Sequence, residues 1–171
     1  MIKLVEPSEK YMKSYIEAFE EYKKHDVSSY GFSDATTTNV LEKFDNYKKE
    51  RNLKSGRVGA HFFWLVDDEN DYFIGEITIR HNLNEALERY GGHIGYGIRR
   101  SEWNKGYGTR MLELALIEAK KIGLCEILIT CDDDNTGSAR VMEKNGFVFS
   151  DKIENIFNGE TIVTRRYRKT I

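Results

Sequence analysis

The stretch of sequence that decides the fold runs from Tyr96 to Arg110 and reads YGIRRSEWNKGYGTR. A short apolar run, residues 93–98, leads into a charged turn, then the glycine pair Gly106 and Gly108, then a helical pattern. Because glycine has no Cβ, several backbone N–H groups can point at one anion beside the positive end of the helix dipole. The order of strand, glycine loop and helix therefore predicts a site for a phosphate or pyrophosphate.

The spacing of these glycines excludes two well-known phosphate-binding loops. A P-loop needs four residues between its glycines and then Lys followed by Ser or Thr, which residues 106–109 do not provide. A dinucleotide-binding fingerprint needs a third glycine at position 111, which is Met111. The glycine pair by itself also fits a tight turn at a helix start, so further motifs have to decide between these interpretations.

Length and composition indicate one globular domain. The chain has 171 residues, of which 40% are hydrophobic and 32% charged, and a single proline. A net charge of -2 gives no indication of a nucleic-acid or membrane partner. Residues 1–6 are too short and polar for a signal peptide, and no window approaches the roughly 18 apolar residues of a membrane span. We therefore expect a cytoplasmic protein.

The two cysteines are not expected to form a disulfide. Cys125 and Cys131 lie in one apparent strand, and at ~3.3 Å per residue they stand about 20 Å apart. Cys131 could act as an acyl-cysteine nucleophile, but a cysteine inside a strand more often fills the core.

Hydrophobic periodicity predicts alternating helices and strands along the whole chain. Strands are expected at 1–6, 61–66, 72–80, 93–98, 125–131, 147–156 and 161–168. Helices are expected from Ser8, from Thr37 or Thr38, from the glycine loop to Gly123, and over about 136–145. Residues 82–92 are expected to be a connection, and Asn158-Gly159 should form the turn of a C-terminal hairpin.

A second motif follows the strand expected at 125–131. Residues 135–147 read NTGSARVMEKNGF, and residues 103–108 before them read WNKGYG. These two motifs and the order of elements resemble the GNAT superfamily of coenzyme-A-dependent N-acyltransferases, best over about 72–150. Residues 80–84 and 91–96 also resemble an uncharacterised subgroup of predicted acetyltransferases. The resemblance implies a single α/β (α+β) N-acetyltransferase-like domain over 1–171, with a mixed, mostly antiparallel sheet of about seven strands flanked by about four helices.

The resemblance implies acetyl-CoA as the cosubstrate and no metal. Backbone amides of 105–110 would hold the pyrophosphate, and the strand 93–98 would splay from 125–131 to admit the pantetheine arm. Gly95 and Gly97 permit that close approach, although they also fit a strand packed against a helix. An amide such as that of Tyr96 would polarise the acyl carbonyl. The residues expected to bind the cofactor are Tyr96, Gly97, Ile98, Lys105, Gly106, Tyr107, Gly108, Thr109, Arg110, Asn135 and Ser138.

The catalytic residues depart from the family pattern. Met142 stands where many members carry a tyrosine as general acid, and about Gly92 stands where a glutamate is usual. His93 on the same strand and His81 at the end of the preceding strand are our candidates for the base, since the pKa of histidine suits proton transfer near neutral pH. Tyr96 and Glu76 are further candidates. Each histidine also fits a purely structural role at the end of a strand.

Residues 132–143 nearly satisfy a calcium-binding EF-hand loop, but the segment before them is strand-like where a helix is required. Two functions of different class stay open. One is an acyltransferase acting on an amine of a small molecule or peptide, and the other is a non-catalytic acyl-CoA-binding or regulatory module. The resemblance leaves the acceptor, the acyl chain and a homodimer open.

Overall fold

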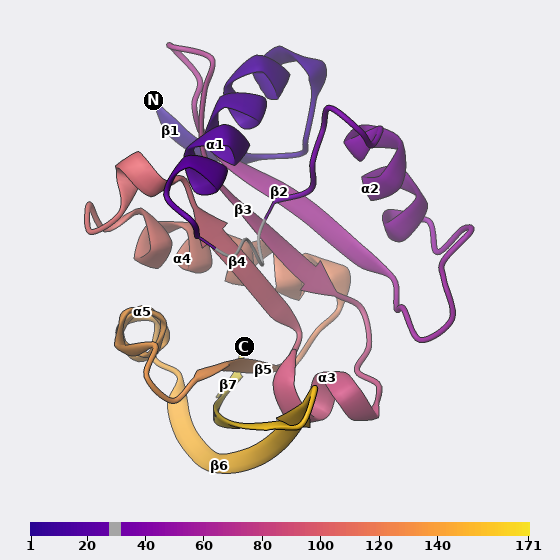
Figure 1. The fold of residues 1–171 in the computed structure, drawn as a ribbon, viewed down its shortest axis with the longest axis vertical. Coiled ribbons are helices and arrows are strands. Elements are labelled where there is room, and N and C mark those ends of the chain that lie inside the picture. The colour runs from indigo at the N-terminus through magenta and orange to yellow at the C-terminus, as the bar shows by residue number, and fades with distance from the viewer. Residues whose placement is uncertain (28–31) are drawn as a thin grey trace.

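In the computed structural model, which describes residues 1–27 and 32–171, the chain forms a seven-stranded sheet (Figure 1). The strand order is β1-β2-β3-β4-β5-β7-β6. The strands are β1 (Ile2–Val5), β2 (Ala60–Asp67), β3 (Tyr72–Arg80), β4 (Ile94–Ile98), β5 (Glu126–Asp132), β6 (Val148–Phe157) and β7 (Glu160–Thr170). Neighbouring strands are antiparallel except for the parallel pair β4 and β5, which confirms the mixed, mostly antiparallel sheet expected from the sequence.

Within the described residues, five α-helices accompany the sheet, one more than the sequence predicted. They are α1 (Met12–Lys24), α2 (Val40–Lys48), α3 (Glu85–Tyr90), α4 (Tyr107–Ile122) and α5 (Thr136–Lys144), with two short 3-10 helices, η1 (Glu9–Tyr11) and η2 (Arg100–Glu102). The expectation of a plain connection over 82–92 was wrong, because Asn84 caps α3 by accepting a hydrogen bond from Leu87 N at 3.0 Å. The cap of α2 is Asn39 rather than Thr37 or Thr38, and its side chain accepts from Glu42 N.

The sheet separates two hydrophobic cores. Alternate residues of β2 face opposite sides, so Phe63 belongs to the core under α4 and Trp64 to the core under α1 and α2. Trp64, Tyr15 and Phe73 form the centre of the second core, with Tyr15 and Trp64 stacked at 4.7 Å between ring centroids. The two layers of helices therefore hold β3 and β4 from both sides.

Two turns behave as the sequence predicted. Gly123 ends α4 in the left-handed conformation with φ 100°, and Asn158 and Gly159 form the hairpin turn with φ 51° and 84°. Within residues 1–27 and 32–171, none of the helices combines the length and apolar character needed to cross a bilayer.

Candidate functional site

The centre of the sheet opens between β4 and β5. Among the described residues these strands pair in register only at Ile94 and Ile129, whereas β3 and β4 pair over five positions. His93 N donates to Leu128 O at 2.7 Å just before this point. Beyond Ile94 the two strands diverge, which leaves one edge of β4 without a neighbouring strand.

The backbone of Tyr96 faces this gap. Arg99 N donates to Ile74 O at 2.7 Å, so the N–H of Arg99 points toward β3. The N–H groups alternate in direction along a strand, and Tyr96 lies an odd number of residues before Arg99. Its N–H therefore points away from β3 and toward β5.

The glycine loop forms the start of α4. Gly106 has φ 84°, and a Cβ added there would meet no heavy atom within 4 Å. The first hydrogen bond of the helix runs from Arg110 N to Gly106 O at 3.2 Å, so the N–H groups of residues 107–109 have no acceptor inside the helix. A Cβ on Gly108 would instead lie 3.3 Å from Val141 Cγ2, so this glycine lets α4 pack closely against α5.

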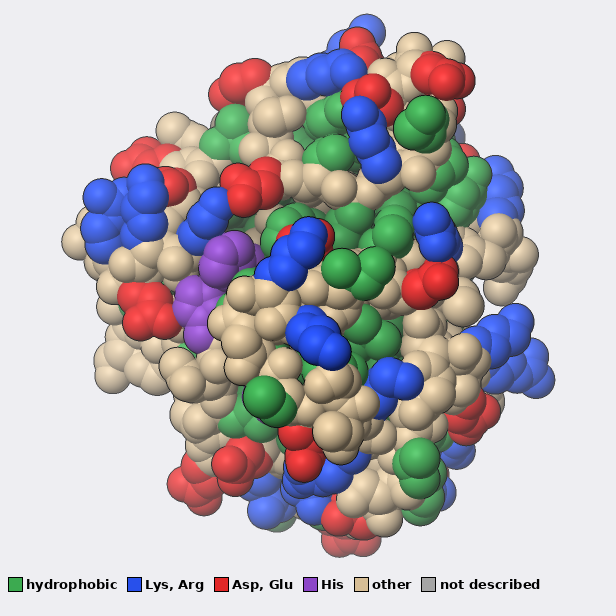
Figure 2. All heavy atoms as spheres, turned by 180° about the vertical axis from the view of Figure 1, so that it is seen from behind, with side chains coloured by type: hydrophobic (Ala, Val, Ile, Leu, Met, Phe, Trp, Pro, Cys, Tyr) green, Lys and Arg blue, Asp and Glu red, His purple; other side chains and the backbone are tan. Residues whose placement is uncertain are grey.

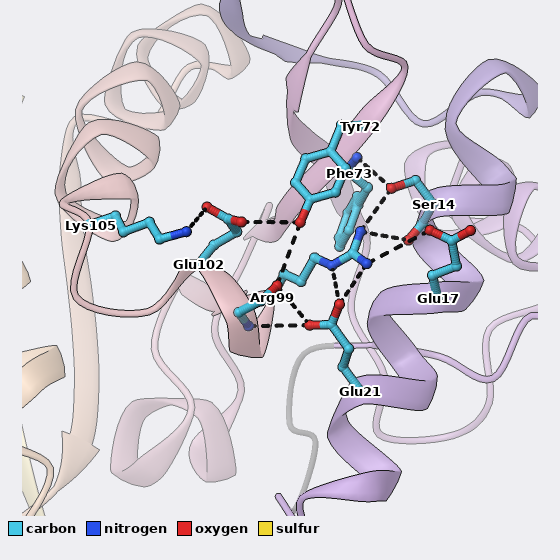
Figure 3. Close-up of polar contacts among 9 residues, drawn as sticks. Ser14, Glu17, Glu21, Tyr72, Phe73, Arg99, Glu102 and Lys105 are labelled. Carbon is cyan, nitrogen blue, oxygen red and sulfur yellow. Dashed lines mark hydrogen bonds and ion pairs between the residues drawn. The ribbon is translucent and has the colours of Figure 1, made fainter.

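A buried ion pair fixes the segment between β4 and the glycine loop (Figure 3). The guanidinium of Arg99 lies 2.6 Å from Glu21 on α1, and it donates to Ser14 Oγ at 2.9 Å. Ser101 donates to the other oxygen of Glu21 from its N–H and its hydroxyl. These contacts lower the pKa of Glu21 against the opposing effect of burial. Helix α1 is therefore tied to η2, directly before the loop.

The same network continues to the loop itself (Figure 3). Arg99 lies over the ring of Tyr72 at 4.4 Å, and the Tyr72 hydroxyl donates to Glu102 at 3.1 Å. Glu102 then pairs with Lys105 at 3.0 Å. The position of Lys105 thus depends on contacts that reach back to the N-terminal helix.

On the other side of the gap, the start of α5 carries a second set of polar groups. Asn135 caps the helix, and its Oδ1 accepts from Ser138 N at 3.0 Å. The Tyr96 hydroxyl lies 2.8 Å from Ser138 Oγ. Burial raises the pKa of Tyr96 to about 12, against the effect of the Ser138 hydrogen bond, so the phenol keeps its proton at neutral pH. Tyr96 and Ser138, two predicted cofactor residues, therefore meet directly.

A cleft of about 210 Å³ lies on the face of the sheet covered by α1 and α2. Glu76 of β3 forms part of its wall, pairs in register with Gly97 of β4, and is 3% exposed. Trp64 Nε1 donates to its carboxylate at 2.8 Å. Burial raises the pKa of Glu76 to about 8, although Trp64, Lys43 and Tyr15 oppose the shift.

The structure places His93 at the base of the splay with one of its two ring nitrogens engaged. His93 Nδ1 accepts the backbone N–H of Leu128 at 3.0 Å, so this nitrogen serves the junction of β4 and β5. Burial lowers the pKa of His93. The residue is not part of the cleft wall that holds Glu76. Its geometry suits a structural role better than proton transfer from an acceptor.

His81 belongs to a different cavity. Its Nε2 lies 2.8 Å from His61 Nδ1, and its Nδ1 lies 2.7 Å from Glu50. Both histidines border a hollow of about 610 Å³ beside the end of α4. Figure 2 views the molecule from the side opposite to Figure 1 and shows histidine side chains near one edge, among acidic and basic ones. The two predicted histidines therefore do not converge on one site.

A family model described as "Acetyltransferase (GNAT) domain" matches residues 4–148, which is most of the sequence. The chain belongs to the GNAT acetyltransferase family. This membership indicates acyltransferase activity and confirms the resemblance drawn from the two motifs. Comparison with curated proteins finds no significant match.

Solved GNAT structures share the fold over nearly the whole chain. RimL, a ribosomal L7/L12 alpha-N-protein acetyltransferase solved with coenzyme A, has a TM-score of 0.70 and 17% identity, with 99% of this chain and 94% of that chain covered. The microcin self-immunity acetyltransferase MccE, solved with acetyl-CoA and AMP, has a TM-score of 0.73 and 19% identity, covering 99% and 92%. A ribosomal-protein-S5-alanine acetyltransferase from Vibrio fischeri has a TM-score of 0.71 and 20% identity, with 99% of this chain and 91% of that chain covered.

Two positions singled out in the sequence are core residues of this GNAT domain. Met142 is fully buried in the cluster under α4 and α5. Cys131 is buried in the same cluster, and burial raises the pKa of its thiol to about 11, which keeps it protonated. Within residues 1–27 and 32–171, no group of three or more His, Cys, Asp or Glu side chains is arranged to hold a metal ion.

Sequence reasoning missed the residues whose partners lie far away along the chain. Arg99 and Glu21 are 78 positions apart, and the contact between them has no local signature. Lys43, Arg57 and Arg80 come from three different segments and border the same cleft. Glu76 was among the further candidates, and its sequence signal is a charged residue in the middle of the otherwise uncharged run YFIGEITI at 72–79.

Proposed function

We propose that this GNAT domain transfers an acetyl group from acetyl-CoA to an amine, with Glu76 as the base. The observation that carries the proposal is the divergence of β4 and β5 next to the free N-terminus of α4. A gap edged by unpaired backbone and a row of helix N–H groups suits a ligand with an extended amide-bearing arm and a pyrophosphate.

The residues around the gap fit coenzyme A. Gly106 leaves open space over the start of α4, where the N–H groups of residues 107–109 can bind the pyrophosphate. Lys105, Gly106, Tyr107, Gly108, Thr109 and Arg110 would form this cradle. Gly97 and Ile98 would border the pantetheine arm on the β4 side, and Asn135 and Ser138 on the α5 side. Bound acetyl-CoA supplies an acetyl group activated as a thioester.

The chain's own groups supply orientation and proton transfer. The N–H of Tyr96 faces the gap and would donate to the acyl oxygen, and such fixed donors stabilise developing negative charge. Glu76 would accept the proton that the amine loses as the C–N bond forms and the C–S bond breaks. The Tyr96 phenol, which stays protonated, would supply a proton to the departing sulfur.

Glu76 suits the role of base better than either histidine. It is part of the cleft wall and lies directly across from Gly97 at the gap. A carboxyl with a pKa of about 8 is a stronger base than an ordinary glutamate, and general bases work best with a pKa near the operating pH. His93 instead accepts a backbone N–H, and His81 contacts His61 and Glu50 at a separate cavity.

The cofactor assignment is tested by ligand-induced thermal stabilisation. Acetyl-CoA and CoA should raise the melting temperature, because a ligand that binds only the native state stabilises it by about 2.7 kcal/mol at 100 times Kd. NAD and ATP at matched concentration should do much less, and equal shifts would contradict the assignment. Release of thiol from acetyl-CoA in the presence of amines then tests transfer. CoA binding with no thiol release for any amine would favour the non-catalytic alternative.

A further inference from the structure

Three basic side chains from separate segments border the cleft that contains Glu76. Lys43 comes from α2, Arg57 from the connection between α2 and β2, and Arg80 from the end of β3. The Arg80 guanidinium also lies over β4, since a Cβ on Gly95 would be 3.5 Å from its Nη2. The group therefore extends from the mouth of the cleft to the strand that borders the gap.

Among the described residues, none of these three cations has a carboxylate partner. Within residues 1–27 and 32–171, no Asp or Glu oxygen lies within 4.0 Å of a side-chain nitrogen of Lys43, Arg57 or Arg80. Lys43 donates to Ser33 Oγ at 2.6 Å, and Arg80 donates to the carbonyl oxygens of Gly91 and Gly92 at 3.0 Å. The remaining residues, 28–31, read SSYG and contain no acid that could neutralise them.

The arginines of β7 provide a contrast inside the same protein. Arg165 pairs with Asp133, Arg166 with Asp151 and Arg168 with Glu126, at 2.5 to 2.7 Å. Those cations are matched although they lie on an outer hairpin where water already solvates charge. In the cleft, Lys43 and Arg80 are partly removed from water, and no carboxylate among the described residues pairs with either, which is costly for an isolated protein.

The charges in the cleft also act on one another. Burial lowers the pKa of Lys43, against the effect of Glu76 and together with the charge of Arg57. Burial and the charge of Arg57 also lower the pKa of Arg80. Glu76 is the only acid of the cleft wall in the described part of the chain. Because its pKa is about 8, it carries little negative charge at neutral pH and does not offset three cations.

We propose that the acceptor is an amine that also carries a carboxylate or phosphate group, which Lys43, Arg57 and Arg80 bind while the amine faces Glu76. This inference rests on the proposed function, because it specifies the acceptor of the same site. Arginine and lysine are the residues that recognise these anions, arginine through paired hydrogen bonds.

The size of the cleft limits what enters it. Its volume of about 210 Å³ is near that of seven waters at about 30 Å³ each, and is below the range common for drug-sized ligands. One unit the size of an amino acid therefore fits. That unit is either a free small molecule or the first residue of an acidic peptide, and both carry the same chemistry.

The test compares amines that differ only in charge. Wild-type protein saturated with acetyl-CoA is assayed for thiol release with 4-aminobutyrate, butylamine and 1,4-diaminobutane, and with phosphoethanolamine and ethanolamine. Two tetrapeptides that differ only in an N-terminal Asp or Lys form the second arm. We expect kcat/KM to be at least tenfold higher for the anionic member of a set. A preference among the small amines indicates a free small molecule as the acceptor, and a preference among the tetrapeptides indicates the first residue of an acidic peptide. The melting temperature of the CoA-saturated protein with each amine gives a readout that needs no turnover.

Two variants locate the effect. Arg57→Glu changes an exposed residue at the cleft mouth and should reduce the preference for the anionic amine at least tenfold. Lys144→Glu makes the same change in charge at the end of α5, which packs on the opposite face of the sheet, and should leave the preference within twofold. CoA alone should stabilise both variants as it does the wild type.

The outcomes separate the two proposals. A CoA shift without any anionic preference, in either rate or melting temperature, overturns the assigned acceptor class and leaves the acetyltransferase proposal standing. Equal loss of preference in Arg57→Glu and Lys144→Glu overturns the assigned binding residues, because long-range charge alone would then explain it. Absence of any CoA shift in the wild type overturns both proposals.

Discussion

The two sides of β4 offer different kinds of chemical groups to a ligand. The loop side consists of residues 94–110, which follow one another in the sequence and offer mainly backbone N–H groups. The cleft side is assembled from α2, the connection after it, β3 and α3, and offers side chains. Backbone recognition needs glycine at fixed positions and is therefore visible in the sequence, whereas a wall built from distant side chains leaves no contiguous motif.

The two sides of β4 also differ in whether their basic side chains are paired with acids. Near the loop, Arg99 pairs with Glu21, Lys105 with Glu102 and Arg110 with Glu113. In the cleft, the basic side chains have no such partners among the described residues. The loop side is thus held in shape before any ligand binds, and the cleft side keeps its charges available. Changes on the two sides should have separable effects on cofactor binding and on turnover.

The largest effect is expected for Glu76→Gln. Removing a general base costs typically 10²–10⁴ in rate, so kcat/KM should fall by at least about 10² while CoA still stabilises the protein. In the wild type, kcat/KM should rise with pH through about 8 as Glu76 loses its proton. A pH–rate profile of both proteins with one acceptor checks this. Full activity in the variant would remove Glu76 from the mechanism.

Glu76→Gln should also change how the free energy of unfolding depends on pH, and this measurement shows whether the variant is folded. The pKa of Glu76 is raised on folding, so between about pH 4.5 and pH 8 the native state holds a proton that the unfolded state has lost. The wild type should therefore lose stability as pH rises through that window, by an amount on the order of a few kcal/mol. Glu76→Gln should lack that loss, and urea unfolding at pH 5 and pH 8.5 measures the difference.

The next largest effect is expected on removal of the Arg99–Glu21 ion pair, which holds the segment before the glycine loop in place. Arg99→Met removes one partner of an ion pair in which the arginine is 7% exposed, leaving Glu21 uncompensated. We expect the free energy of unfolding to fall by about 2–3 kcal/mol and CoA affinity to fall several-fold. Urea unfolding and CoA titration measure the two quantities. Glu17→Gln is the control, because Glu17 is half exposed and 3.7 Å from Arg99, and its loss should change stability by less than about 0.5 kcal/mol.

A smaller effect is expected for Gly108→Val. A Cβ there lies 3.3 Å from Val141 Cγ2, so the larger valine side chain should push the start of α4 away from α5. CoA affinity should drop about tenfold, since a shift of the helix N-terminus misdirects its N–H groups. Adding Val141→Ala should recover much of that affinity. If the double variant folds well and still binds CoA poorly, the side chain obstructs the ligand directly.

The sequence predicted most of the fold because most elements carry a buried periodic face. All seven strands were expected, and α4 was bounded by Gly106 and Gly123. Helix α3 was not predicted because none of its six residues is buried, so its sequence has no hydrophobic periodicity. The cap of α2 could not be chosen because Thr37, Thr38 and Asn39 are adjacent and all suit the role.

The candidate site likewise contains one part that was predictable from local sequence and one part that was not. The position of the glycine loop at the start of α4 was predicted from the sequence, since it depends on local residues such as Gly106, and its binding of the cofactor stays a prediction. The network of Arg99 and the basic wall of the cleft could not be predicted, since they depend on which segments the sheet brings together. The histidines attracted attention for their intrinsic pKa, but that property does not show whether their nitrogens are already engaged.

The smallest effects on catalysis are expected for His93→Gln and His81→Gln. His93 accepts the N–H of Leu128, so its replacement should lower the free energy of unfolding by about 1 kcal/mol and leave kcat/KM within about threefold. His81 contacts His61 and Glu50 at a separate cavity, so its replacement should also leave kcat/KM within about threefold of the wild type. Both variants are assayed beside Glu76→Gln with the same acceptor. A loss of about 10² in either histidine variant, with CoA binding intact, would return the role of base to that histidine, because a residue that only supports the strand junction has no means of slowing proton transfer selectively.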